Sequence, residues 1–345
     1  FVRRNQPLFQ TRQFVERMDA APRLTSRLRW KELTLLPYFG VRGSYWGSSR
    51  PEVSGQITGT NLSRFSREAG VDLLLPSLAR VFNAPGWMGG GKLKHVIEPR
   101  ATYRHVSGVA DFNRIIRFDD IELVTNTSEA EVSVANRFYV KDRGGVTKEY
   151  LSWTVWQRRY FDPTLGGVLN EDSRNVVQTQ LQLTPYAFFD RPRRYSPIVS
   201  ALRMSPLRSL DIEWRTDYDP LRGGITNSGF MAQGRVQNFL VTAGHNQVKS
   251  LDTLSPPANQ FSGMIGWGDS NRKGLSAGFF ANYDYRIGRM QFNQSQVTYN
   301  TDCCGLSVQF RRFNFGTRNE NQWRVAFVIA NIGSFGTLRR QERFF

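Results

Sequence analysis

Apolar and polar residues alternate with a period of two along most of this chain. Residues 208–218 place Leu210, Ile212, Trp214 and Tyr218 on one face and mainly charged residues on the other. A period of two predicts β-strands with one apolar face. The same alternation recurs in residues 65–75, 132–140, 151–155, 275–285 and 306–310.

Turn-forming residues separate these segments, for example at 142–145, 219–224 and 269–274. We estimate about 12 to 14 strands, because a membrane strand of about 10 residues and its connection take roughly 25 residues. No apolar run of about 18 residues exists, which excludes helical membrane spans. The mean hydropathy of −0.44 is still compatible with strands that cross a membrane with one apolar face.

Three features favour an antiparallel transmembrane β-barrel over a soluble β-sandwich. Aromatic residues such as Trp46, Trp153, Tyr160, Tyr283 and Trp323 occur often near the expected strand ends, where amphipathic rings mark membrane interfaces. The apolar faces are nearly free of charge, whereas the opposite faces carry both signs. The strands also follow one another with little helix between them, as in a large meander. A soluble carbohydrate-binding β-protein remains the third alternative.

The formal net charge of +17 would ordinarily indicate a nucleic-acid partner. Here the basic residues are scattered singly along the alternating segments, so nucleic acid is not the expected partner. Arginines along a barrel interior would instead suit a phosphorylated anionic lipid, because a guanidinium binds phosphate with two hydrogen bonds.

Residues with catalytic or metal-binding chemistry are sparse. His95, His105 and His245 stand alone, with no carboxylate cluster or nucleophile motif nearby. Residues 89–92 lack the flanking residues of a phosphate-binding loop. We therefore predict no enzymatic activity, no metal and no cofactor.

Three stretches resemble the LptD (OstA) family of lipopolysaccharide-assembly outer-membrane proteins. They are the Glu-Pro-containing residues 93–104, the adjacent cysteines within 299–306, and residues 319–335. Their order is similar to that in the C-terminal portion of the family's larger barrel. The resemblance implies that residues 1–345 are the C-terminal part of that barrel domain, in the cell outer membrane of a Gram-negative bacterium.

The resemblance also implies a function and partners. The family inserts lipopolysaccharide into the outer leaflet through a hydrated lumen and a lateral seam. It works with an LptE-like outer-membrane lipoprotein that plugs the lumen and with periplasmic bridge proteins that deliver lipopolysaccharide. A passive porin or other barrel transporter is the alternative prediction.

The resemblance assigns roles to particular residues. It implies that Cys303 and Cys304 form disulfides with cysteines outside this chain, although the pair could also be two free residues at a strand end. One lip of the seam is predicted at Trp323, Val325, Phe327 and Ile329. Proline removes a hydrogen-bond donor from a sheet, so Pro99 predicts a strand bulge, with loosening of the seam as the less favoured alternative.

Overall fold

The computed structural model contains a single antiparallel sheet of 19 strands and one short 3₁₀ helix, η1 (Gly86–Met88). The structure describes residues 16–50, 59–88, 91–111, 114–116, 122, 126–141, 144–162, 193–249, 257–269, 272–315, 318–329 and 333–336. The strands are β1 (Arg17–Ala20), β2 (Arg23–Thr25), β3 (Leu28–Trp30), β4 (Leu33–Trp46), β5 (Leu62–Leu74), β6 (Leu78–Asn83), β7 (Lys92–Ser107), β8 (Thr127–Lys141), β9 (Thr147–Tyr160), β10 (Ile198–Leu207), β11 (Leu210–Asp219), β12 (Gly224–Val236), β13 (Phe239–Val248), β14 (Ala258–Trp267), β15 (Gly274–Asp284), β16 (Arg289–Asn300), β17 (Cys304–Phe315), β18 (Arg318–Ile329) and β19 (Gly333–Gly336).

The predicted number of 12 to 14 strands is too low. β1, β2 and β3 pair in turn along β4, and β5 and β6 pair in turn along β7, so each group forms one interrupted strand. Connections shorter than expected leave room for the extra strands. For example, only residues 208–209 separate β10 from β11.

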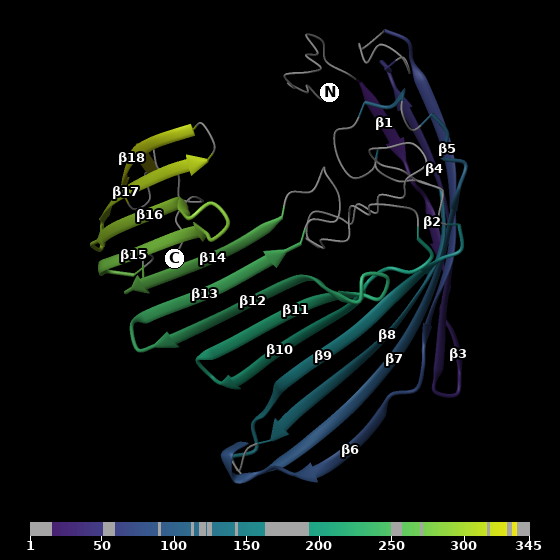
Figure 1. Ribbon diagram of the computed structural model, residues 1–345, viewed down its shortest axis with the longest axis horizontal. Helices are drawn as coiled ribbons and strands as arrows, with labels where there is room; N and C mark the ends of the chain where they lie inside the picture. The colour runs from purple at the N-terminus through teal and green to yellow at the C-terminus, as the bar shows by residue number, and fades with distance from the viewer. Residues whose placement is uncertain are drawn as a thin grey trace.

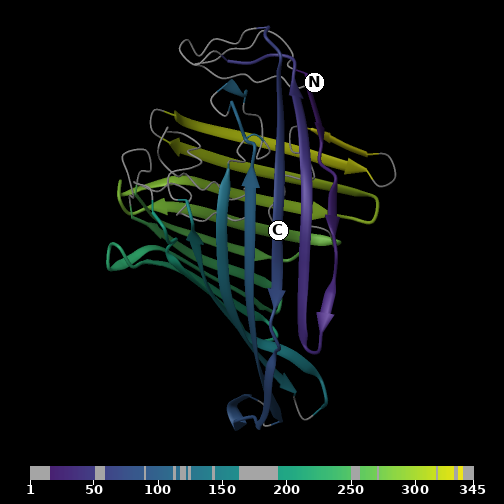
Figure 2. The same cartoon turned by 90° about the vertical axis from the view of Figure 1, so that its right-hand side faces the viewer.

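The sheet curls strongly around a concave side (Figure 1), and a quarter turn shows the first and last strands crossing at a steep angle (Figure 2). Each strand from β7 to β19 pairs with its sequence neighbour. Among the described residues, β1–β3 form one edge of the sheet and β18–β19 form the other.

The two faces of the sheet differ in chemistry, as the alternation predicts. Leu210, Ile212, Trp214 and Tyr218 share the outer face of β11, and Trp214 pairs with Phe230 of β12. Many large apolar side chains on this face are exposed, including Trp214 at 47%. Glu213, on the opposite face, pairs in register with Arg203 of β10. The inner face is therefore polar and the outer face apolar.

The two rims of the sheet also differ. The longest connections, residues 47–61, 108–126 and 161–197, all lie on one rim. The connections on the other rim are short, and residues 208–209, 237–238 and 301–303 are typical of them. In bacterial outer-membrane barrels the short turns face the periplasm and the long loops face outward.

The bulge predicted at Pro99 is absent. Pro99 pairs with Val134 of β8, and the register of β7 against β8 runs without a shift through this point. The interruption lies in the strand on the other side, because β5 ends at Leu74 and β6 begins at Leu78. Leu75 donates its backbone N–H to the Pro99 carbonyl oxygen at 3.3 Å. The proline nitrogen, which has no hydrogen, therefore faces this gap, and no ladder hydrogen bond is lost.

Candidate functional site

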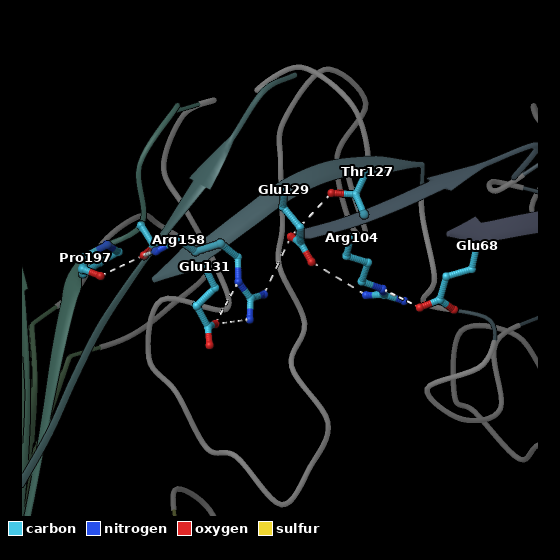
Figure 3. A network of polar contacts seen from close by, with 8 residues as sticks. Glu68, Arg104, Thr127, Glu129, Glu131, Arg158 and Pro197 are labelled. Atoms are coloured by element: carbon cyan, nitrogen blue, oxygen red, sulfur yellow. Dashed lines mark hydrogen bonds and ion pairs between the residues drawn. The ribbon is translucent and has the colours of Figure 1, made fainter. Parts of the chain in front are cut away.

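A row of alternating charges crosses the inner face from β5 to β9 (Figure 3). Arg104 Nε lies 2.9 Å from Glu68 Oε1, and Arg104 Nη1 lies 3.8 Å from Glu129 Oε1. Arg158 Nη1 lies 3.7 Å from Glu129 Oε2, and Arg158 Nη2 lies 2.7 Å from Glu131 Oε2. Each arginine therefore bridges two carboxylates, and Glu129 bridges both arginines.

Strand register produces this row. Arg104 pairs directly with Glu129, and Glu131 pairs with Arg158. The side chains of Glu129 and Glu131 point the same way because a strand repeats every two residues. The Glu129 side chain is 9% exposed, so two guanidinium groups compensate a nearly buried carboxylate.

A second row lies nearer the short-turn rim. Arg137 Nε lies 2.8 Å from Glu98 Oε2, and Arg137 Nη1 lies 3.2 Å from Glu149 Oε2. Arg100 Nη2 lies 2.7 Å from Asp72 Oδ2. These paired charges extend the polar wall across the width of the sheet.

The connection between β7 and β8 is anchored to the inner face near the long-loop rim. Glu122 is fully buried, forms an ion pair with Arg17, and accepts a hydrogen bond from Trp46 Nε1 at 3.4 Å. Ile115 packs with Trp46 and Leu62 in an apolar cluster beside it. The sequence analysis missed this cluster, because its members are far apart along the chain and no local motif connects them.

The inner face of β16 and β17 carries uncharged polar side chains instead. Gln309 Nε2 donates to Gln296 Oε1 at 3.0 Å, and Gln296 Nε2 donates to Thr298 Oγ1 at 3.2 Å. Thr298 Oγ1 in turn donates to Ser307 Oγ at 3.0 Å. All four residues are buried. The inner wall thus has a charged part on β5–β11 and an amide-rich part on β16–β17.

A shallow groove of about 530 Å³ lies on the sheet between these two parts. Arg203, Glu213 and Arg215 line it with Ser and Thr hydroxyls. Gly229 and Gly244 also line it, and a wall without side chains there leaves space. This groove can accept hydrogen-bonding groups such as sugar hydroxyls and phosphates.

The adjacent cysteines lie at the short-turn rim, in the connection between β16 and β17. The two Sγ atoms are 2.7 Å apart and both thiols are free, with Cys303 exposed. Thr301 Oγ1 accepts a hydrogen bond from the Cys304 backbone N–H at 3.1 Å, which fixes the turn. Hydrogen bonding from Cys304 and then from Thr301 lowers the pKa of the Cys303 thiol.

The predicted seam residues Trp323, Val325, Phe327 and Ile329 all lie on the outer face of β18, where Trp323 is 70% exposed. β18 is not the last described strand, because β19 follows it. β19 pairs only with Ala326–Ile329, so the first part of β18 has a described partner on one side alone.

The histidines show no catalytic or metal-binding arrangement in the described part of the chain. His95 stacks on Phe138 with ring centroids 4.2 Å apart, and His245 Nε2 lies 2.8 Å from Asn259 Oδ1. Over the same residues, no cluster of metal-ligating side chains is present, and no helix is long and apolar enough to span a bilayer.

A large antiparallel sheet with an apolar exposed outer face and a polar inner face is the architecture of an outer-membrane β-barrel protein. The family model described as LPS transport system D, LptD, matches residues 4–272. The chain therefore belongs to the LptD family, whose members are transport proteins of the outer membrane.

Other comparisons add little to this assignment. No curated protein matches the chain. Among solved structures, the chain is similar to Acinetobacter baumannii OccAB4, with 10% identity, coverage of 89% of this chain and 99% of that chain, and a TM-score of 0.24.

Proposed function

We propose that this chain inserts lipopolysaccharide into the outer leaflet of the outer membrane, with the sugar-phosphate part crossing the polar interior and the acyl chains leaving through a lateral seam. Membership of the LptD family gives the transport role. The observation that carries the finer proposal is the charged and amide-rich inner face, opposite an apolar outer face.

Paired charges suit a transient passage better than bare charges. Arg104 and Arg158 are each neutralised by two glutamates, so a phosphate must compete with carboxylates for the guanidinium groups. Transport requires binding that is favourable enough for entry and weak enough for release. An uncompensated row of arginines would hold a polyanion too tightly.

A lateral exit needs a weakly paired edge. We propose that residues 1–345 form the C-terminal part of a larger barrel and that β18, through Trp323, Val325, Phe327 and Ile329, forms one lip of its seam. The incomplete pairing of β18 by the short β19 supports this assignment. Exposed strand edges otherwise invite unwanted pairing.

We also propose that an LptE-like lipoprotein occupies the interior and that periplasmic bridge proteins deliver the lipid from the short-turn side. Cys303 and Cys304 lie at that rim, where disulfides to cysteines outside this chain would connect the barrel to a periplasmic part. Non-reducing peptide mapping of the full-length protein tests these links. Two free thiols would contradict them.

The transport proposal is tested by depleting the full-length protein in its own cells and labelling surface lipopolysaccharide. We expect loss of surface label, with lipopolysaccharide retained inside the envelope. Unchanged surface label together with reduced uptake of small solutes would instead identify a passive porin.

A further inference from the structure

Three cationic side chains surround a pocket at the short-turn rim, remote from the charged rows of the inner face. The pocket has a volume of about 480 Å³ and lies between the β12–β13 turn and the β14–β15 turn. Arg235, Arg272 and Lys273 contribute the positive charges, and Asp269 is the acidic residue of the lining. The pocket therefore carries a net positive charge.

Aromatic side chains on the outer face fix the depth of this pocket relative to a bilayer. Phe239 begins β13, Trp267 ends β14, and the two residues pair directly. Tyr299 lies one residue before the end of β16 at the same rim (Figure 1). The three rings are 45%, 39% and 55% exposed. Such a girdle lies at the membrane–water interface, so the charges immediately beyond it lie at the depth of lipid headgroups.

The cations are available for an anion to different degrees. Arg235 has no ion-pair partner among the described residues. The Arg272 side chain is 84% exposed and contacts Asp269 at 3.3 Å. Lys273 Nζ lies 2.6 Å from Asp302 Oδ2, which would compete with a bound anion. The lining also includes Trp267 and Leu275 from the apolar outer face, which can contact the upper part of an acyl chain.

We propose that this pocket binds the phosphate headgroup of an anionic glycerophospholipid from the leaflet that faces the short turns. A guanidinium contacts phosphate with two hydrogen bonds, an ammonium adds a point charge, and the tryptophan ring packs at the glycerol level. The site is independent of the transport proposal, because it lies outside the inner polar wall.

Native mass spectrometry of the full-length protein in detergent, with added phosphatidylglycerol, tests this proposal. The triple variant Arg235→Gln, Arg272→Gln, Lys273→Gln should bind phosphatidylglycerol roughly tenfold more weakly, because each charge-assisted contact contributes substantially. Arg286→Gln with Arg289→Gln removes two exposed arginines of the β15–β16 turn at the opposite rim and should leave binding unchanged. Asp302→Asn removes the competing carboxylate and should strengthen binding.

Further arms separate the possible outcomes. The variant Arg235→Lys, Arg272→Lys keeps the charges and should retain most binding, and heat-modifiable gel mobility shows that each variant is folded. Diacylglycerol with the same acyl chains should not bind at this site, and inorganic phosphate should not displace the lipid. Equal lipid binding in the triple variant and the opposite-rim control would overturn the proposal. Displacement by inorganic phosphate would replace it with a free-phosphate site.

Discussion

The aromatic ring of Tyr38 lies against the backbone of Gly70, its direct pairing partner across β4 and β5. A Cβ atom added at Gly70 would lie 2.5 Å from Tyr38 Cζ and 2.5 Å from the Tyr103 carbonyl oxygen. On the other side of the ring, the Arg23 guanidinium carbon lies 3.7 Å from the ring centre. The missing side chain at Gly70 thus creates the space in which Tyr38 is held against the inner wall.

Gly70→Ala should therefore destabilise the protein by about 1–3 kcal/mol, the usual cost of overpacking. Urea unfolding in detergent micelles, followed by tryptophan fluorescence, measures the change. Gly43→Ala, at a position where an added Cβ meets nothing within 4 Å, is the matched control and should change the free energy of unfolding little. Equal effects of the two substitutions would show that the Tyr38 contact is unimportant.

Glu129→Gln removes the carboxylate that joins the two halves of the inner charge row. Arg104 and Arg158 would each keep one glutamate, so we expect a loss of about 1–3 kcal/mol rather than complete unfolding. Glu213→Gln is the control, because its pair with Arg203 spans 3.3 Å with side chains 47% and 67% exposed. An exposed pair contributes about 0–1 kcal/mol, so a control as damaging as Glu129→Gln would contradict the proposed role of burial.

Pro99 allows a different kind of test, because its nitrogen faces the gap between β5 and β6. Pro99→Ala should change the free energy of unfolding by less than about 0.5 kcal/mol. Val134→Pro, at the paired position of β8, should cost at least about 1 kcal/mol, because β8 lies between two continuous partners and would lose a ladder hydrogen bond. A large effect of Pro99→Ala would show that the proline itself supports the break.

The sequence predicted the class of fold and the two faces of the sheet well, because a period of two is written locally in each strand. Trp214 and Tyr218 show this, since both lie on the outer face as expected. Residues joined through long-range packing could not be predicted in the same way. Glu122 reaches Trp46 from 76 positions away, and nothing in the sequence around either residue marks that contact.

Pro99 illustrates a second limit of sequence reasoning. The missing donor correctly indicated an interruption in the sheet, but the residue type alone cannot say which strand is interrupted. Here the neighbouring strand breaks and β7 continues. The roles predicted for Cys303, Cys304 and the outer residues of β18 stay predictions, because they depend on parts of the protein beyond this chain.

The Cys303 thiol should react at lower pH than an ordinary cysteine. Hydrogen bonding from Cys304 and Thr301 stabilises its thiolate and lowers its pKa. Because the thiolate is the nucleophile, the rate of alkylation by iodoacetamide should begin to rise at a lower pH than for a free thiol. Rates are measured across a pH series by mass spectrometry on the reduced protein.

Cys304→Ala removes the main hydrogen-bond donor, so the alkylation profile of Cys303 should move toward the ordinary cysteine range. Asp302→Asn serves as the control for nearby charge, because the Asp302 carboxylate opposes ionisation of Cys303 and its removal should move the profile the other way. Opposite shifts in these two variants would identify the hydrogen bond as the cause of the reactivity. If the Cys303 profile were the same in the wild-type protein and in Cys304→Ala, the turn would not activate the thiol, and the ease of disulfide formation would depend on the partner cysteine alone.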